Sequence, residues 1–527
     1  MQMYLRKEKS KVNWVIAGLL LGIIVAAMDN TIISTAMGTI ISEIGGMDKF
    51  IWVSSAYLIA SVVGMPIYGK LSDMYGRKLF YMVGLGLFVL GSVLCGLSQS
   101  MGQLIIFRAV QGLGGGAIMP IAFTIIFDIV PVTQRGKISG LFGAAFGVSS
   151  VFGPLIGAFF AEYINWRGIF YVNIPLGLVS LIFIFCFYHE SLNHFKQKID
   201  WVGAILLVSS VLSLMFALEM GGKNFKWSSF QIIGLFSLFT ILFIVFLFVE
   251  KKVSEPIIPL DLFKSRLFAA SQGVSLFYGS VFIIATVYIP IFVQGAFGES
   301  VTNSGLILIP MMIGTVVGSQ IGGLLVAKLT YRNIMLGSIS LLFTGFILLS
   351  TLSNSTSRWL VTLYMIITGI SVGISFSVLS MSSMHSINFN RRGSANSSVT
   401  FFRAIGMTLG ITIFGTIQNN IMQVRFLKNI PEISNLGRTI ESRSLLQQEV
   451  RMHIPADVLD KMTNILAGSI AEIFKLSLIP LTIALFFIII MGNGRLENLS
   501  HTIKNEKEVV SPDVNETGDT RYINGGE

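Results

Sequence analysis

Fourteen long apolar stretches constrain this chain more than any other feature of its 527 residues. A helix needs about 20 apolar residues to cross a bilayer core of ~30 Å, and each stretch is close to or above that length. Only 12% of the residues are charged, whereas a soluble domain has about 25%. The sequence therefore predicts an all-α polytopic membrane protein. Its expected spans are residues 14–37, 50–68, 79–97, 104–127, 138–163, 168–188, 201–220, 230–249, 267–293, 303–327, 334–353, 359–384, 396–418 and 469–492.

The distribution of Lys and Arg predicts the orientation of these spans. One side of the expected membrane, which includes both termini, carries 23 of these residues, whereas the short loops of the other side carry 5. Positively charged loops stay in the cytoplasm, so both termini are expected there. Residues 419–468 form an expected extracellular loop, which the count omits because long loops translocate regardless of charge. Within it, residues 445–466 have helical periodicity and are expected to form a surface helix rather than a substrate lid.

A weak internal repeat divides the chain into two halves. Arg135-Gly136 recurs as Arg392-Gly393, an offset of 257 residues that also relates several glycines of the two halves. Parallel six-helix halves are a recurrent transporter architecture, in which the substrate site lies between the halves near the membrane midplane. The expected domains are a cytoplasmic N-terminus (1–13), a six-helix bundle (14–188), a linker with two inserted helices (189–266), a second six-helix bundle (267–492) and a disordered cytoplasmic tail (493–527).

A ten-residue hairpin, residues 69–78, joins the second and third expected spans, and we call it the latch loop. Gly69 and Gly76 allow a tight turn. Asp73 can interact with helix N-termini or with an arginine, and Arg77 can pair with a carboxylate. The loop could therefore act as an ionic latch between moving elements, although an ordinary positively charged turn would have a similar composition.

Two charged residues inside the early spans are the candidate proton-coupling site. Asp29 lies well inside the first span, and Arg108 lies in the fourth span on the same helical face as Gln111. An arginine at a helix centre costs about 2.5 to 3.5 kcal/mol, so it normally faces a partner or a wet cavity. Asp29 opposed by Arg108 could load and release a proton; snorkelling of Arg108 or a static ion pair is the alternative. Asn30, Gln111 and Gln294 are the candidate substrate contacts.

Small residues follow one another at helical steps in the fifth span. Such residues allow helices to approach closely, and a proline bends the helix because it removes a backbone donor. Plain tight packing would need the same composition. The members of this expected stripe are Gly143, Gly147, Ser150, Pro154 and Gly157, with Gly153 beside Pro154.

These patterns together resemble the major facilitator superfamily. The latch loop resembles its signature loop G-x-L-x-D-x-x-G-R-K, and residues 108–116 resemble its fourth-helix motif, whose arginine is associated with proton coupling. Gly147-x5-Gly153-Pro154-x2-Gly157 resembles a motif of drug antiporters, and residues 28–33 resemble the first-helix motif of fourteen-helix drug:proton antiporters, with Met28 in place of Leu. The match is to multidrug exporters of Gram-positive bacteria, and it implies the major facilitator fold with a two-helix central insertion.

The resemblance implies proton-coupled efflux of varied amphipathic or cationic drugs across a bacterial cell membrane, by a monomer in the lipid bilayer. Export of a single physiological solute, a lipid precursor or a tetracycline-type substrate remains the alternative. An enzyme is disfavoured because the spans hold no catalytic constellation, and no cofactor or metal is expected. Scattered basic residues also give no reason to expect nucleic acid as a partner. The histidines all lie in expected loops, span ends or the tail: His189, His194, His385, His453 and His501.

Overall fold

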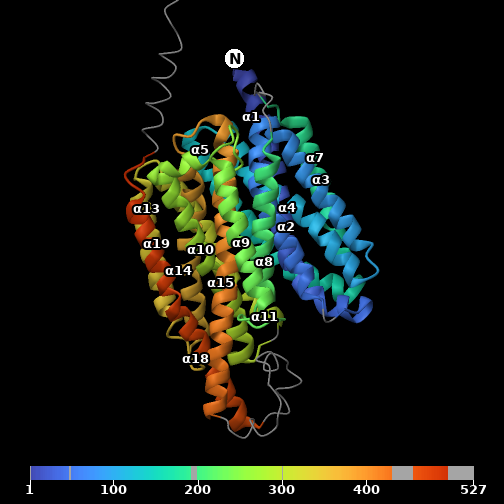
Figure 1. Cartoon of the computed structure of the whole chain (residues 1–527), viewed down its shortest axis with the longest axis vertical. Coiled ribbons are helices and arrows are strands. Elements are labelled where there is room, and N and C mark those ends of the chain that lie inside the picture. Colours follow the sequence, from blue (N-terminus) through green and yellow to red (C-terminus); the bar gives the residue numbers. More distant parts are fainter. Residues whose placement is uncertain are drawn as a thin grey trace, which may run out of the picture.

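The computed structural model describes residues 2–46, 49–190, 199–222, 224–299, 301–429 and 455–495; the side-chain surroundings of some of these, Asn30 and Gly143 among them, are not described. The described chain holds 14 helices that are long and apolar enough to cross a membrane. No β-strand forms in these ranges. The predicted all-α polytopic fold is therefore confirmed (Figure 1).

The first six spans form one bundle, in which the fourth span packs between the second and third and the first span packs against the fifth and sixth. Local sequence sets some helix ends: the Ser100 side chain, for example, accepts a hydrogen bond from Gln103 N and begins the fourth span. The helices are α1 (Gln2–Ile44), α2 (Ile51–Tyr75), α3 (Arg77–Gly96), α4 (Met101–Ile129), α5 (Val132–Phe159) with the π-helical turn η1 (Phe160–Ile164), and α6 (Gly168–Tyr171) followed by α7 (Asn173–Phe187).

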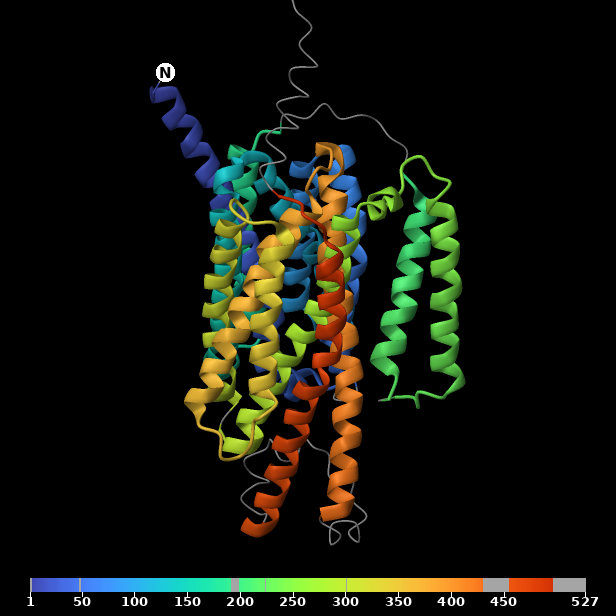
Figure 2. The ribbon, with the colours of Figure 1, turned by 90° about the vertical axis from the view of Figure 1, so that its left-hand side faces the viewer.

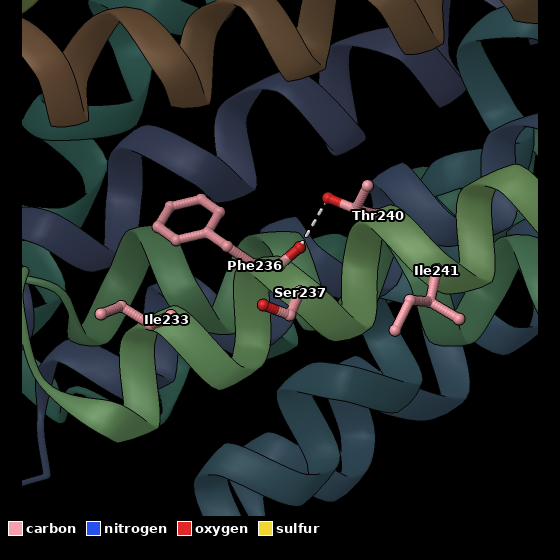
Figure 3. A pocket seen from close by; sticks show the side chains of 5 residues that line it. All are labelled: Ile233, Phe236, Ser237, Thr240 and Ile241. Atoms are coloured by element: carbon pink, nitrogen blue, oxygen red, sulfur yellow. Dashed lines mark hydrogen bonds between the residues drawn. The ribbon is translucent and has the colours of Figure 1, made fainter.

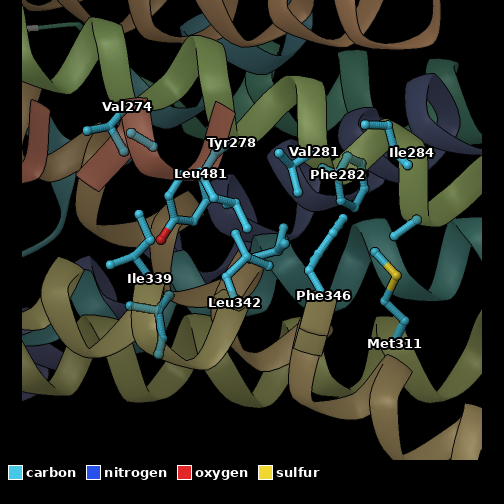
Figure 4. Close-up of a cluster of buried hydrophobic side chains, with 14 of the residues drawn as sticks. Val274, Tyr278, Val281, Phe282, Ile284, Met311, Ile339, Leu342, Phe346 and Leu481 are labelled. Carbon is cyan, nitrogen blue, oxygen red and sulfur yellow. The ribbon is translucent and has the colours of Figure 1, made fainter. Parts of the chain in front are cut away.

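The last six spans form a second bundle. Its apolar core includes Tyr278, Leu342 and Phe346, whose side chains gather between neighbouring helices (Figure 4). Tyr278 also reaches Ser338 Oγ at 3.0 Å, so this buried hydroxyl has a partner. The helices are α10 (Arg266–Phe297), α11 (Val301–Leu306), α12 (Ile309–Leu325), α13 (Tyr331–Leu349), α14 (Arg358–Ser383), η3 (Phe389–Arg391), α15 (Arg392–Asn429), α18 (Ala456–Leu476) and α19 (Leu478–Ile490).

The sequence repeat corresponds to equivalent helix contacts in the two bundles. A Cβ on Gly112 of α4 would lie 2.3 Å from Tyr57 O of α2, and one on Gly369 of α14 would lie 2.1 Å from Met311 O of α12. Both glycines therefore let two backbones touch where any side chain would clash. The bundles meet each other where α5 packs against α12 and where α2 packs against α15.

The two inserted helices, α8 (Trp201–Met220) and α9 (Phe230–Glu250), form a hairpin beside the main body (Figure 2, green). Only α8 packs substantially on the bundles, against α2 and α15. The outer surface of α9 is apolar, with Phe230 87% exposed, and suits contact with lipid. A depression on α9 is lined by Ile233, Phe236, Ser237, Thr240 and Ile241 of that single helix (Figure 3). It holds no charged side chain, and Thr240 Oγ1 donates to Phe236 O (2.8 Å).

The helices around the expected extracellular loop are longer than the sequence predicts. α15 continues to Asn429 instead of ending at 418, and α18 begins at Ala456 instead of 469. Residues 456–466 are helical, as predicted, but they form the first part of α18 and lead directly into the last span instead of forming a separate helix (Figure 2). Residues 430–454 lie outside the described residues. The exact domain boundaries stay a prediction.

Candidate functional site

A buried polar cluster surrounds Asp29 in the first bundle. Asp29 comes from α1 and is 0% exposed, and Arg108 of α4 is 1% exposed. Arg108 Nη1 donates to Asp29 Oδ2 at 2.5 Å. The structure therefore brings together the two residues that the sequence predicted to face each other.

Gln111 lies one helical turn from Arg108 and joins both charges. Its Oε1 accepts from Arg108 Nη1 at 2.7 Å, and its Nε2 donates to Asp29 Oδ1 at 2.8 Å. The other side of the guanidinium contacts α2: Arg108 Nε donates to Val53 O at 3.3 Å, and the ring centroid of Tyr57 lies 4.3 Å from the guanidinium carbon. Arg108 is thus enclosed by protein and does not snorkel.

Two further members of the cluster were not predicted from the sequence. Asn173, the first residue of α7, donates through Nδ2 to Asp29 Oδ1 at 2.9 Å. Ser92 of α3 has its Oγ 2.7 Å from Gln111 Nε2 and 3.2 Å from Asn173 Nδ2. A lone Asn next to apolar residues, 144 positions from Asp29, gives no local signal of this contact.

The cluster holds one carboxylate among several donors. Asp29 accepts hydrogen bonds from a guanidinium and from two side-chain amides. Every member is buried, and the bonds link side chains from α1, α3, α4 and α7. The cluster is thus a closed polar network within the first bundle.

The latch loop joins the two bundles at the end where α2 meets α15. Asp73 accepts from Gly393 N (2.8 Å), Ser394 N (2.7 Å) and Ser394 Oγ (3.0 Å), all at the start of α15. Free N–H groups and a partial positive charge at a helix N-terminus favour a carboxylate in this position. A Cβ on Gly393 would lie 2.6 Å from Asp73 Oδ1, so the contact needs a glycine there.

Arg77 completes the latch with contacts to both bundles. It forms ion pairs with Asp73 (3.3 Å) and with Asp128 at the end of α4, and it donates to Phe389 O at 2.7 Å. Asp128 also lies 3.7 Å from Arg392 of the second bundle. Buried, charge-assisted contacts of this kind are stronger than exposed pairs.

The two glycines of the latch loop are each required for a different structural reason. Gly76 adopts φ 108°, a backbone conformation that other residues rarely adopt. Gly69 lies against α15, where a Cβ would be 2.0 Å from Ser397 Oγ. The first glycine allows the turn, and the second allows α2 to approach α15.

The small residues of α5 lie against helices of both bundles. A Cβ on Gly153 or Gly157 would meet Thr31 or Thr35 of α1, whereas one on Gly147 would meet Met312 of α12 at 3.3 Å. α5 therefore uses small residues both within its own bundle and across to the other, and the stripe itself stays a prediction. Pro154 lies inside the helix, and the surroundings of Gly143 and Ser150 lie outside the described residues.

The structure does not bring the three substrate candidates into one described contact. Gln111 belongs to the Asp29 cluster, and Gln294 donates to Ser304 Oγ at 2.7 Å in the second bundle. The side chain of Asn30 lies outside the described residues. The described part of the chain also contains no group of three or more His, Cys, Asp or Glu side chains that could hold a metal ion.

The described chain is a helical bundle of two halves, with a buried charge cluster in the first half and ion pairs between the halves. The family model described as "Major Facilitator Superfamily" matches residues 19–198 and 194–411. The chain therefore belongs to the Major Facilitator Superfamily.

Similar proteins include two from Bacillus subtilis (strain 168). Multidrug resistance protein 3 is 49% identical over 503 residues, which cover 94% of this chain and 98% of the relative. Multidrug transporter protein MdtP is 34% identical over 530 residues, which cover 96% of this chain and 98% of the relative. The fold is also similar to a crystal structure of the human organic anion transporter MFSD10, with a TM-score of 0.56 and 14% sequence identity. The match covers 89% of this chain and 99% of the human chain.

Proposed function

We propose that this protein exports structurally varied amphipathic or cationic drugs across a bacterial cell membrane in exchange for protons. The observation that carries the proposal is the buried Asp29–Arg108 pair, because it places an ionisable carboxylate inside a chain that is 49% identical to a multidrug resistance protein. Burying an ionisable group in a membrane helix costs free energy, so such a group indicates a functional site.

In this proposal, Asp29 binds and releases its proton as the protein alternates between two arrangements of its helices. In the conformation described, Asp29 accepts hydrogen bonds from three side chains and is buried. A rearrangement that separates α1 from α4 would remove Arg108 from Asp29 and admit water, so that the carboxylate binds a proton. Return to the sealed arrangement would then require the proton to leave.

The latch selects between the two arrangements of the bundles. Its contacts cross from α2 and α4 to the start of α15 and hold the bundles together at that end. By the distribution of Lys and Arg, this end faces the cytoplasm. We therefore assign the structure to the state in which the cytoplasmic side is closed, and opening toward drug in the cytoplasm breaks the contacts of Asp73.

Dye uptake into inverted membrane vesicles tests the proposal. Vesicles that contain the protein should accumulate an ethidium-like dye when a proton gradient, acidic inside, is applied, and should lose it when the gradient is collapsed. Vesicles without the protein are the control. Gradient-driven expulsion of dye would indicate an importer, and no gradient-dependent movement would contradict drug transport.

A further inference from the structure

Two buried acidic side chains close the base of the inserted hairpin, outside the polar cluster and the latch. Asp200 caps the start of α8 and is 8% exposed, and Glu250 ends α9 and is 2% exposed. The transport mechanism proposed above uses neither residue. Side chains of this kind are rarely buried unless they are paired.

One oxygen of each carboxyl group has a backbone donor. Asp200 Oδ1 accepts from Gly203 N at 2.8 Å, and Glu250 Oε1 accepts from Ile258 N at 2.8 Å. The second bond holds the chain that follows α9 against the base of the hairpin.

The other oxygen of each carboxyl group has no hydrogen-bond partner among the described residues. Asp200 Oδ2 and Glu250 Oε2 are buried, and neither receives a hydrogen bond. Both lie over Gly203, where a Cβ would be 2.1 Å from Asp200 Oδ2 and 3.2 Å from Glu250 Oε2. A single point above Gly203 thus lies within 3.2 Å of both oxygens, so the two carboxyl groups are neighbours. Two ionised carboxylates can only accept, so this arrangement leaves a place for one hydrogen atom.

Charged groups on the neighbouring elements pair elsewhere. Lys70 of α2 bonds to Glu255 at 2.7 Å, and Arg391 before α15 bonds to Asp261 at 2.6 Å. Lys251 and Lys252, which follow Glu250, are exposed. Within the described residues, no salt bridge reaches either acid of the pair; Lys196 and Lys198 fall in the segment 191–198, outside those residues.

We propose that Asp200 and Glu250 share one proton and form a second proton-binding site, which fastens the base of the α8–α9 hairpin. Two facing carboxylates in a water-poor setting cannot both be ionised at low cost, whereas one proton between them gives a strong charge-assisted hydrogen bond. Loss of that proton places two negative charges side by side and drives the ends of α8 and α9 apart.

The site connects the hairpin to the latch. Glu250 fixes Ile258, and Glu255 in the same segment pairs with Lys70, which directly follows Gly69 in the latch loop. A proton on the Asp200–Glu250 pair therefore keeps this segment docked on α2. The pH on the latch side of the membrane controls how firmly the hairpin is attached.

Infrared spectroscopy of the purified full-length protein tests for the shared proton. As the pH is raised, wild-type protein should lose a carbonyl band of a protonated carboxyl group. Glu250→Gln and Asp200→Asn are nearly isosteric, and each should lack that band. Asp29→Asn and Glu255→Gln should keep it. A wild-type spectrum without the band, or a band unchanged in both variants of the pair, would overturn the proposal.

Spin labels at positions 251 and 79 test the attachment of the hairpin. Both positions are exposed, one at the hairpin base and one in α3. The distribution of distances between the two spin labels should be narrow at low pH and broader at high pH. Glu250→Gln should keep it narrow at both, because its amide donates permanently to Asp200. An equally narrow wild-type distribution at both pH values would contradict the link between this proton and the hairpin.

Discussion

Single residues in the polar cluster show what sequence reasoning can and cannot find. Asp29 and Arg108 were predictable because charges inside apolar helices need partners. Ser92 and Asn173 were not, because small polar residues occur in many membrane helices and their contact with Asp29 depends on how α3 and α7 pack. The charged centre of the site is thus visible in the sequence, whereas the neutral groups that position it require the fold.

Asn173→Ala should slow transport while the protein still inserts. The change removes one of the three side chains that donate to Asp29, a bond to a charged group worth about 1.5 to 3 kcal/mol. We expect turnover of dye in vesicles to fall by about tenfold or more, since 1.4 kcal/mol corresponds to a factor of ten. Ser180→Ala, a buried hydroxyl on the same helix that bonds to Gly18 O, is the control. Wild-type turnover in Asn173→Ala would remove Asn173 from the mechanism.

At the scale of elements, hydropathy predicts which segments cross the membrane but not how far the helices continue. Residues 419–429 and 456–468 are less apolar than the spans they join, yet they extend α15 and α18. Helical backbone bonds do not require an apolar environment, so a helix can run beyond the bilayer. On α5, likewise, spacing places the small residues on a face of the helix, but packing decides which neighbour each one meets.

Asp73→Asn should weaken the latch without unfolding the bundle. Asparagine keeps the shape, but it loses the charge that the N-terminus of α15 stabilises by about 0.3 to 1 kcal/mol. We expect dye turnover to fall several-fold at equal expression. Asp261→Asn, which removes an exposed ion pair with Arg391, is the matched control and should change little. Equal turnover of Asp73→Asn and wild type would exclude the latch from the cycle.

The end of α1 should respond to acid through Glu43. A hydrogen bond from Arg167, followed by one from Trp166, lowers the pKa of Glu43 below its usual value of 4.5. Because the folded-state pKa is lowered, this contact is present at neutral pH and is lost as the pH falls through that lowered value. In a variant that keeps Trp166 as its only tryptophan, the emission should shift in strong acid, and Glu43→Gln should abolish the shift. An identical acid shift in both proteins would contradict this role.

At the scale of the whole molecule, the repeat and the charge distribution predict the architecture. The offset of 257 residues pairs Gly112 with Gly369, and both occupy close helix contacts in equivalent positions. The count of basic residues predicts orientation, which the packing of helices alone does not fix. Substrate identity is harder to predict because one fold serves many cargoes.

Thiol labelling tests the orientation. A cysteine in place of Ile440, in a background with the exposed Cys186 changed to Ser, should react with an impermeant reagent in intact cells. Cys95 is buried and should not interfere. Reaction only after permeabilisation would place residues 419–468 in the cytoplasm and reverse the topology.

The exchange of a proton at Asp29 is the central claim, and Asp29→Asn in inverted vesicles tests it most directly. An amide keeps the size of the side chain but cannot bind and release a proton. We predict that the variant still binds dye but no longer accumulates it when a proton gradient is applied, and that Asp29→Glu retains part of the activity. Full gradient-driven accumulation by Asp29→Asn would show that another group carries the proton and would contradict the account.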